Sequence, residues 1–379
     1  MKTRIKVAIL VAIVWMVIGC VVWTSNKSVK EETRQEQKCR ALLSEIALSG
    51  GLRENREREY KVIDAFMFLN EFDMLRLRLA HLNSMVEHFV IVRGTKSFQG
   101  GNLRKPKENA SKDMNASKER KARSDLEFWS QIQSEKTAEL GERSFRDGDY
   151  SGMRHKISIF EIDWEVQNIA DTYWGAEVYQ RNAIGKFSEE IAFGQGWDPL
   201  ETLVVISDAD EIISRDYLQY LKMGCLSFDN AALAVAMQRW SYYGFVWKAP
   251  QLWHGSSVLL LSTLSNDFHS MANDVRLARK TSNVVTLGDV ARPAGWHCTF
   301  CLPLDQWNEK LSSFSHREIG TKRLHILSMA RKTGKWLVDA RARAIFDNSS
   351  SALPLELSTP SLFPSLYSEL SYLLRIDDD

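Results

Sequence analysis

Two periods of apolar and polar positions alternate along the chain from residue 60 onward. Short runs rich in branched and aromatic residues predict buried strands at residues 60–68, 88–92, 157–162 and 203–212. Apolar residues at helical spacing predict helices between these runs, at residues 72–82 and 177–193. Asn70, followed three residues later by Asp73, predicts a capping box at the start of the first helix. Alternating strands and helices are typical of an α/β domain whose mainly parallel sheet is covered on both faces.

Two further segments depart from this alternation. Residues 100–150 interrupt it, and within them residues 104–123 carry eight basic and three acidic side chains. We interpret this stretch as a solvated insertion loop, with a binding arm as the alternative. Residues 346–379 form a C-terminal tail, in which leucines at helical spacing predict a short terminal helix; they are Leu366, Leu370, Leu373 and Leu374.

The N-terminus carries one long apolar run at residues 5–23, with Lys6 at its edge as the only charge. Nineteen residues at about 1.5 Å each reach roughly 28 Å, enough to cross a bilayer core of about 30 Å. Basic residues precede the run, which predicts a cytoplasmic tail at residues 1–4 and a translocated remainder. A cleaved signal peptide is the alternative, but its apolar core is usually about 7–15 residues long. We therefore expect a membrane anchor, followed by a polar stem at residues 24–59.

Composition and charge narrow the classes of protein. The chain has 379 residues, 44% of them apolar and 26% charged, which indicates a folded globular protein rather than a disordered one. Its net charge of +1 gives no basis for bulk binding to nucleic acid. Five cysteines are too few for a disulfide scaffold. One of them, Cys39, lies in the predicted stem, where it either pairs between chains or stays free.

A cluster of carboxylates follows the fourth predicted strand, in the sequence V-V-I-S-D-A-D-E that ends at Glu211. Ligands of open α/β sheets gather beyond the carboxyl ends of the strands. On an extended chain, Asp208 and Asp210 point the same way and can face one ligand. Carboxylate oxygens suit Mg²⁺ or Mn²⁺, which can neutralise a diphosphate leaving group. The alternative is a strand-end turn with solvated carboxylates.

A second informative segment reads G-W-H-C-T-F-C and contains His297, Cys298 and Cys301. A disulfide between these two cysteines is the simplest interpretation, and a link from one of them to Cys225 is the alternative. A zinc site would need His297 and His316 as the remaining ligands. A thioredoxin-like role would require a βαβ unit beginning at the motif, which the pattern does not predict.

Other polar and aromatic residues are weaker candidates. Arg181 and Asn182 lie on the helix before the carboxylate strand, where they either contact a nucleotide or form an exposed charged face. Residues 240–247, W-S-Y-Y-G-F-V-W, either stack against sugars or form a pair of core strands.

These blocks together resemble glycosyltransferase family 17. The likeness begins at V-I-D-A-F-M-F-L-N-E-F-D, which contains Asn70 and Glu71, and continues in H-F-V-I-V-R-G. It extends through V-V-I-S-D-A-D-E-I and G-W-H-C-T-F-C to K-L-S-S-F-S-H-R-E, the block that contains His316. The resemblance covers residues 60–337 apart from the insertion. The chain differs from the family pattern at Arg93, at Ile213 and in the insertion itself.

The resemblance implies a GT-A-like nucleotide-sugar fold and a catalytic domain at residues 60–345. It implies UDP-GlcNAc as donor and Mn²⁺ (or Mg²⁺) as cofactor, held through Asp208 and Asp210. We expect the donor to contact Asn70, Glu71, Arg181 and Asp208. The partners implied are a glycan or glycoprotein acceptor and the Golgi membrane, in a single-pass type II topology with a lumenal catalytic domain.

The expected reaction is an inverting transfer of GlcNAc to a mannose-containing glycan, which belongs to N-glycan processing. A general base must take the proton of the attacking hydroxyl, and Glu211 and His316 are the candidates, ahead of Glu318 and Asp289. Two alternatives remain open: a membrane-tethered carbohydrate-binding protein without turnover, and a transferase that uses another nucleotide sugar.

Overall fold

One mixed β-sheet passes through the described part of the chain. The computed structural model describes residues 39, 41, 48–49, 59–95, 97, 116–133, 148–163, 173–226, 228, 232–281, 284–303, 306–307, 310–311, 324–334, 344–347 and 353–375. The predicted membrane anchor lies outside these residues. Within them, no helix combines the length and apolar character needed to cross a bilayer.

The main path of the sheet has the order β1-β9-β7-β8-β5-β2-β3-β4. Its strands are β1 (Leu48–Ser49), β9 (Val284–Leu287), β7 (Leu233–Tyr242), β8 (Trp247–Leu260), β5 (Thr202–Asp208), β2 (Lys61–Phe68), β3 (His88–Gly94) and β4 (Ile157–Ile162). Three shorter strands join it: β6 (Glu211–Ile213), β10 (Gly295–Thr299) and β11 (Ile345–Phe346). Strands β5, β2, β3 and β4 pair in parallel, as the sequence predicts. The other half is mixed, because β8 runs antiparallel to both β5 and β7.

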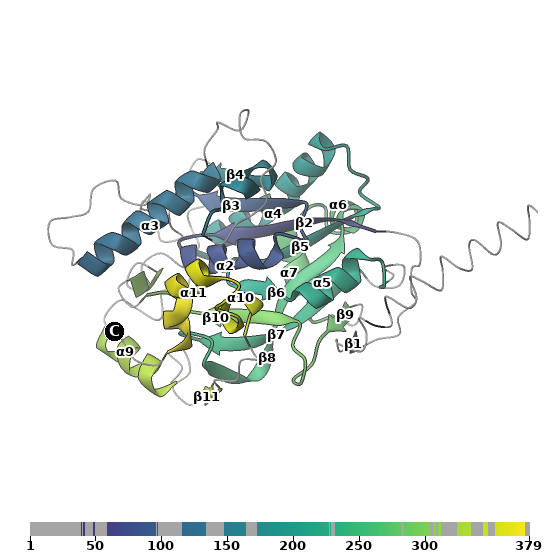
Figure 1. Cartoon of the computed structure of the whole chain (residues 1–379). Helices are drawn as coiled ribbons and strands as arrows, with labels where there is room; N and C mark the ends of the chain where they lie inside the picture. The colour runs from purple at the N-terminus through teal and green to yellow at the C-terminus, as the bar shows by residue number, and fades with distance from the viewer. Residues whose placement is uncertain are drawn as a thin grey trace, which may run out of the picture.

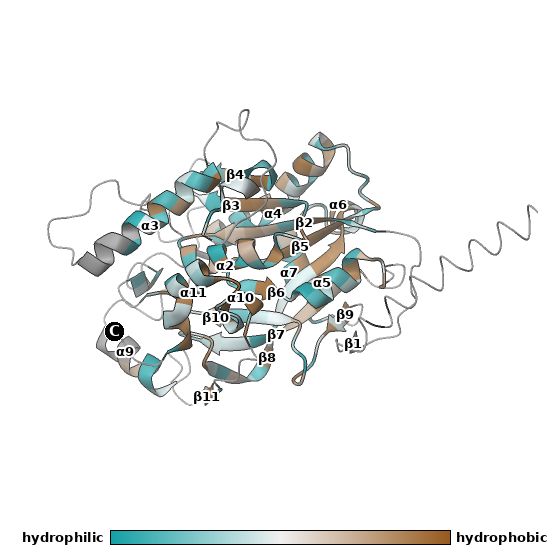
Figure 2. Ribbon diagram, in the orientation of Figure 1, coloured by the Kyte–Doolittle hydropathy of each residue, from teal (hydrophilic) through white to brown (hydrophobic). Residues whose placement is uncertain are grey.

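Helices cover both faces of the parallel half (Figure 1). The helical elements are α2 (Phe72–Leu82), α3 (Ala116–Gln133), η1 (Ser151–Lys156), α4 (Tyr173–Gly194), α5 (Arg215–Lys222), α6 (Leu261–Asn266), α7 (Ala272–Ala278), α9 (Leu324–Thr333), α10 (Leu355–Ser358), α11 (Pro364–Leu370) and η6 (Ser371–Leu374). One core cluster joins the sheet to α2, α3 and α5, and a second joins it to α4, α6 and α7. In Figure 2 the hydrophobic colour is concentrated on the central strands, as this two-sided burial requires.

Alternation along β2 explains how one strand serves both clusters. Phe66 and Phe68 face the α2 side, whereas Ala65 and Met67 face the α4 side. Successive side chains of a strand point to opposite faces, so a continuous apolar run is what a doubly covered strand needs. The predicted strand at residues 60–68 is therefore confirmed together with its two-sided burial.

The predicted capping box at the start of α2 is wrong. The N-cap residue is Glu71, and no side chain caps the helix. Instead, a Glu71 carboxylate oxygen accepts hydrogen bonds from the backbone N–H groups of Leu69 and Asn70. Asp73 is buried and pairs with Arg76, so its carboxylate is engaged in tertiary contacts instead of in the cap.

Helix α3 occupies residues 116–133 of the insertion, so the end of the predicted loop, residues 116–123, is helical. Residues 104–115 lie outside the described residues. Beyond the basic stretch, the apolar residues Phe128, Trp129 and Ile132 are buried on one side of this helix, and Trp129 stacks on Phe68 with ring centroids 5.4 Å apart. The prediction missed the helix because it weighed the basic stretch and not this apolar face.

The C-terminal segment belongs to the domain. Helices α10 and α11, yellow in Figure 1, lie against α2. Leu366, Leu370 and Leu373 are buried, which confirms the predicted helical face, whereas Leu374 is half-buried. Glu356 of α10 is fully buried and accepts from His81 at 2.9 Å and from Arg215 at 2.5 Å. A buried carboxylate with two partners fixes this segment to α2 and α5.

The described residues form two disulfides. Cys298 pairs with Cys301, one of the two expected pairings. Cys39 pairs with Cys225, so neither expectation for Cys39, a free thiol or a bond between chains, is correct. Since both cysteines of the C-x-x-C motif are in a disulfide, they are not zinc ligands. The Cys39–Cys225 bond and the β1–β9 pairing attach parts of the predicted stem to the domain.

Removing the Cys39–Cys225 bond should weaken the fold, because it closes a separation of 186 residues. We expect Cys39→Ser to lower the free energy of unfolding by about 2–4 kcal/mol in urea titrations of the protein. The double variant Cys39→Ser/Cys225→Ser is the control and should lose no more than either single variant. Equal stability of Cys39→Ser and the unmodified protein would contradict the pairing.

Candidate active site

A cavity of about 1010 Å³ opens beyond the carboxyl ends of β2 and β5. Its lining comes from the end of β2, from α4 and α7, from the turn after β5, and from β7, β8 and β10. This is where ligands of open α/β sheets bind, and its size is at the upper end of the range of about 300–1,000 Å³ usual for such sites. Of the predicted site residues, Glu71, Arg181, Asp208 and Asp210 line it.

The two predicted metal aspartates lie on the same cavity but not on one extended strand. Strand β5 ends at Asp208, and Ala209 and Asp210 form a turn before β6. The two carboxylates therefore have different neighbours. The sequence predicted that the two side chains face one site, and both line this cavity. The predicted cause, an extended i, i+2 arrangement, does not apply.

Asp208 is neutralised by two arginines. Its Oδ1 lies 3.0 Å from Arg181 Nη2, and its Oδ2 lies 2.7 Å from Arg276 Nη1. Burial alone raises the pKa of Asp208, but Arg276 and Arg181 outweigh burial and hold the pKa far below its usual range. Both oxygens of this carboxylate are engaged, and the residue carries its charge at any ordinary pH.

Asp210 has the opposite electrostatics. Its nearest charged or ionisable partners are distant, with His297 Nε2 at 3.8 Å and Lys310 Nζ at 4.0 Å. Burial raises the pKa of Asp210 to about 7; Lys310 opposes this rise, while Glu71 and Asp208 add to it. The Asp210 side chain is 14% exposed, less than the 25% of Asp208, but no arginine contacts it, so it is the more weakly held of the pair.

Glu211 lies behind the cavity and does not line it. Its side chain is fully buried, where Oε1 accepts from Trp253 Nε1 at 2.6 Å and Oε2 lies 3.3 Å from Arg279 Nη2. Its Oε2 also accepts from the backbone N–H of Asp208 at 3.3 Å. This geometry supports a role in holding the turn and does not support the predicted role as general base.

Of the remaining base candidates the structure describes Asp289, which does not line the cavity. His316 and Glu318 lie outside the described residues. Asp289 is exposed, and its Oδ1 accepts from the backbone N–H groups of Ala291 and Arg292 at 2.9 and 2.8 Å, which stabilises a turn after β9.

Some of the predicted donor contacts line the cavity and others do not. Glu71 lines the cavity and forms an ion pair with Lys310. Asn70 does not line it, and within the described chain its buried amide has no hydrogen-bond partner. Asn182 does not contact the cavity either, since its Oδ1 accepts from the backbone N–H of Asn273 at 2.9 Å and so ties α4 to α7.

Several residues of the site were not predicted. Arg276 belongs to α7 and Arg279 follows its last residue, while Lys310 comes from the segment after β10 and Trp253 from β8. The spacing R-L-A-R-K on a short helix is a signal for a cationic face and could have identified the two arginines. Lys310 and Trp253 carry no local signal.

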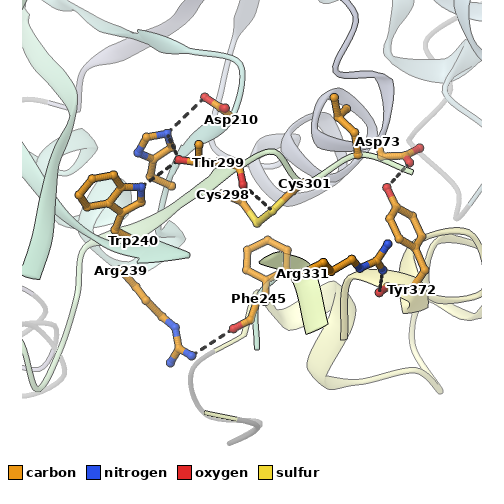
Figure 3. Close-up of a disulfide and its surroundings, with 12 residues drawn as sticks. Asp73, Asp210, Arg239, Trp240, Phe245, Cys298, Thr299, Cys301, Arg331 and Tyr372 are labelled. Carbon is orange, nitrogen blue, oxygen red and sulfur yellow. Dashed lines mark hydrogen bonds and ion pairs between the residues drawn. A yellow bond between two sulfur atoms is a disulfide. The ribbon is translucent and has the colours of Figure 1, made fainter. Parts of the chain in front are cut away.

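His297 was considered only as a zinc ligand, but it lies beside Asp210 in the cavity lining. Burial lowers its pKa to about 4, so its imidazole is neutral near pH 7. Its Nε2 lies 3.2 Å from Thr299 Oγ1. Figure 3 shows the Cys298–Cys301 disulfide between this side, with Asp210, Thr299 and Trp240, and the C-terminal side, with Arg331 and Tyr372. The Cys298 N–H donates to the Asp210 carbonyl at 3.1 Å, so the disulfide loop also supports the turn.

One buried ion pair supports the turn from below. Arg78 of α2 and Asp64 of β2 are both 0% exposed, and they pair with Nη2 and Oδ1 at 2.5 Å and Nε and Oδ2 at 2.7 Å. Arg78 also donates to the carbonyls of Asp208 and Glu211 at 2.9 and 2.8 Å, and to Ser207 Oγ at 2.5 Å. These acceptors use all five N–H donors of the guanidinium.

Comparison with known proteins identifies the family. The model of glycosyltransferase family 17 matches residues 22–145 and 144–335. The chain belongs to glycosyltransferase family 17. Membership implies a nucleotide-sugar donor and a sugar acceptor, which agrees with a cavity lined by both cationic and aromatic side chains.

Relatives within the family are distant. The chain is 22% identical over 348 residues to the rat β-1,4-mannosyl-glycoprotein 4-β-N-acetylglucosaminyltransferase. The aligned region covers 84% of this chain and 55% of the relative. The human protein of the same name is 23% identical over 262 residues, covering 65% of this chain and 42% of the relative. The chain thus spans about half the length of the curated relatives it matches. No solved structure is significantly similar to it.

Breaking the buried pair should destabilise the whole domain. Arg78→Met leaves Asp64 charged without a partner in the core, and we expect a loss of about 3–5 kcal/mol in the free energy of unfolding. The double variant Arg78→Met/Asp64→Leu removes both charges and should recover part of that loss. Urea titrations of the three proteins measure both effects, and a double variant no more stable than Arg78→Met would argue against an unpaired charge as the cause.

The raised pKa of Asp210 predicts a pH-dependent stability. Between its usual pKa of 3.8 and the folded value of about 7, the folded protein keeps a proton that the unfolded chain releases. The stabilisation that Asp210 contributes is therefore complete below about pH 4 and is lost as the pH rises through about 7. Asp210→Asn cannot ionise, so with chelator present we expect it to be more stable than the unmodified protein at about pH 8. Near pH 4 the two proteins should be equally stable. Thermal unfolding curves that differ by the same amount at both pH values would refute the assignment.

Proposed function

We propose that this protein is an inverting glycosyltransferase that moves GlcNAc from UDP-GlcNAc to a mannose-containing glycan of an N-glycoprotein. Family membership supports sugar transfer, and the activity named for the rat and human relatives suggests the sugar and the acceptor. The observation that carries the proposal is the pair of aspartates in unlike electrostatic surroundings on one large cavity. A GT-A-like fold is part of the proposal, supported by the parallel strands that end at this cavity.

The donor diphosphate fits the cationic side of the cavity. Arg181 projects from α4 and Arg276 from α7, and both reach the end of β5 where they hold Asp208. Guanidinium groups recognise phosphate oxygens through paired N–H donors. In this arrangement Asp208 orients the two arginines, and the diphosphate binds to their remaining donors.

A divalent cation, Mn²⁺ or Mg²⁺, fits Asp210 better than Asp208. Among the described residues no group of three His, Cys, Asp or Glu side chains is arranged to hold a metal. Such ions are often held by one or two carboxylates together with substrate phosphates, and Asp210 is the carboxylate of the pair that lines the cavity without an arginine partner. When bound, the ion would neutralise the departing UDP. With Glu211 turned away from the cavity, we retain His316 as the proposed base for the acceptor hydroxyl.

We also propose a lumenal location on the Golgi membrane, in a single-pass type II topology. The apolar run at residues 5–23 and the basic residues before it support the anchor. Two disulfides in the described chain support an oxidising compartment.

A donor panel tests the function. The purified lumenal segment is incubated with UDP-GlcNAc, UDP-Gal and GDP-mannose, with Mn²⁺ or with chelator, and released UDP or GDP is measured. We expect UDP release from UDP-GlcNAc that depends on the metal, and a loss of at least about 100-fold in Asp210→Asn, the range for removing an electrostatic group at the reacting centre.

Three other outcomes have distinct meanings. Preferred release from another donor would replace the proposed sugar. Release unaffected by chelator and by Asp210→Asn would remove the metal from the proposal. No release from any donor would favour a carbohydrate-binding protein without turnover.

A further inference from the structure

The cavity has two chemically different sides. Arg181, Arg276 and Lys280 lie on one side, and their charge exceeds that of the carboxylates Glu177 and Asp208 beside them. The other side is formed by Trp240 of β7, Trp253 of β8 and His297 of β10, which we call the aromatic wall. The two aspartates separate along the same division, because Asp208 contacts the arginines whereas Asp210 lies 3.8 Å from His297.

We propose that the aromatic wall is the acceptor subsite and that it binds a pyranose ring of the acceptor glycan against Trp240 and Trp253. The proposal rests on the proposed function, since it concerns the second substrate of the same reaction. It assigns acceptor specificity to residues that neither the family match nor the names of the relatives identify.

The aromatic wall is a fixed surface. Trp240 Nε1 donates to Thr299 Oγ1 at 2.9 Å, and Trp253 Nε1 donates to Glu211 Oε1 at 2.6 Å. The Trp240 and Trp253 ring centroids lie 4.9 Å apart, and those of Trp253 and His297 lie 4.6 Å apart. With their N–H groups engaged by the protein, the indoles offer a ligand their rings, held in place before it arrives.

The chemistry of the wall suits a neutral sugar. The face of an aromatic ring carries partial negative charge and attracts the weakly positive C–H groups of a pyranose. Both indoles are half-buried, so part of each ring remains open to the cavity. Gln251 of β8 also lines the cavity, and its amide can bind sugar hydroxyls.

Charge favours the part of the cavity beside the arginines for the donor. A nucleoside diphosphate carries several negative charges and is attracted by Arg181, Arg276 and Lys280. The two indoles of the wall carry no charge, so they offer a diphosphate no comparable attraction. Asp210 lies beside the wall, so a sugar held there has its hydroxyls next to the centre where the donor bond breaks.

Separate measurement of the two substrates tests the proposal. The variant is Trp240→Leu, which removes the aromatic ring, and the probe is a mannose-terminated N-glycan oligosaccharide. We expect the acceptor KM to rise about ten-fold or more, with the donor KM changed less than about two-fold. Trp240→Phe keeps an aromatic face and should restore most of the acceptor affinity. Phe193→Leu is the control, because Phe193 is 89% exposed on α4 and does not line the cavity.

Calorimetric titration of the oligosaccharide separates failure of this proposal from failure of the proposed function. If no donor is turned over, binding that Trp240→Leu weakens about ten-fold would still establish the subsite. A donor KM that rises while the acceptor KM stays constant would overturn it, and so would equal oligosaccharide affinity in Trp240→Leu and the unmodified protein. Absence of measurable binding to the unmodified protein would overturn it as well.

Discussion

The site depends on one guanidinium that is completely removed from water. Arg78 connects α2 to β2 through Asp64 and to the turn after β5 through the carbonyls of Asp208 and Glu211. A buried charge is tolerated only when a counter-charge and hydrogen bonds replace its hydration, and here every N–H of the group has an acceptor. Because two of those acceptors are carbonyls of the turn, the position of the carboxylates is set by the core of the domain.

From that turn the chain distributes its carboxylates among different partners. Along β5, Val205 faces the α2 side and Ile206 the α4 side, and the same alternation directs Ser207 to Arg78 and Asp208 to the arginines of α4 and α7. Ending the strand at Asp208 frees Asp210 from this alternation. Asp208 therefore stays ionised, whereas the pKa of Asp210 is raised to about 7. Pairs of titratable groups whose pKa values are separated by their surroundings are characteristic of catalytic sites.

The local parts of this arrangement could be predicted from the sequence. Buried strands and the leucine face of the C-terminal helix follow from periodicity over a few residues, and the D-x-D-E cluster follows from its place after a strand. The partners of the cluster could not be predicted, because Arg276 and Lys310 reach it from positions 68 and 100 residues beyond Asp208 and Asp210. The same limit applies to Cys39 and Cys225, whose pairing depends on a separation of 186 residues.

The insertion and Arg93 are physically connected. The Arg93 guanidinium at the end of β3 lies 5.2 Å from the ring centroid of Trp129, which belongs to the insertion helix. Trp129 in turn stacks on Phe68, a residue of the cavity lining. An arginine over an aromatic ring is stabilised by the partial negative charge of the ring face. Arg93 therefore helps to hold the insertion helix against the sheet, and the helix supports one side of the cavity.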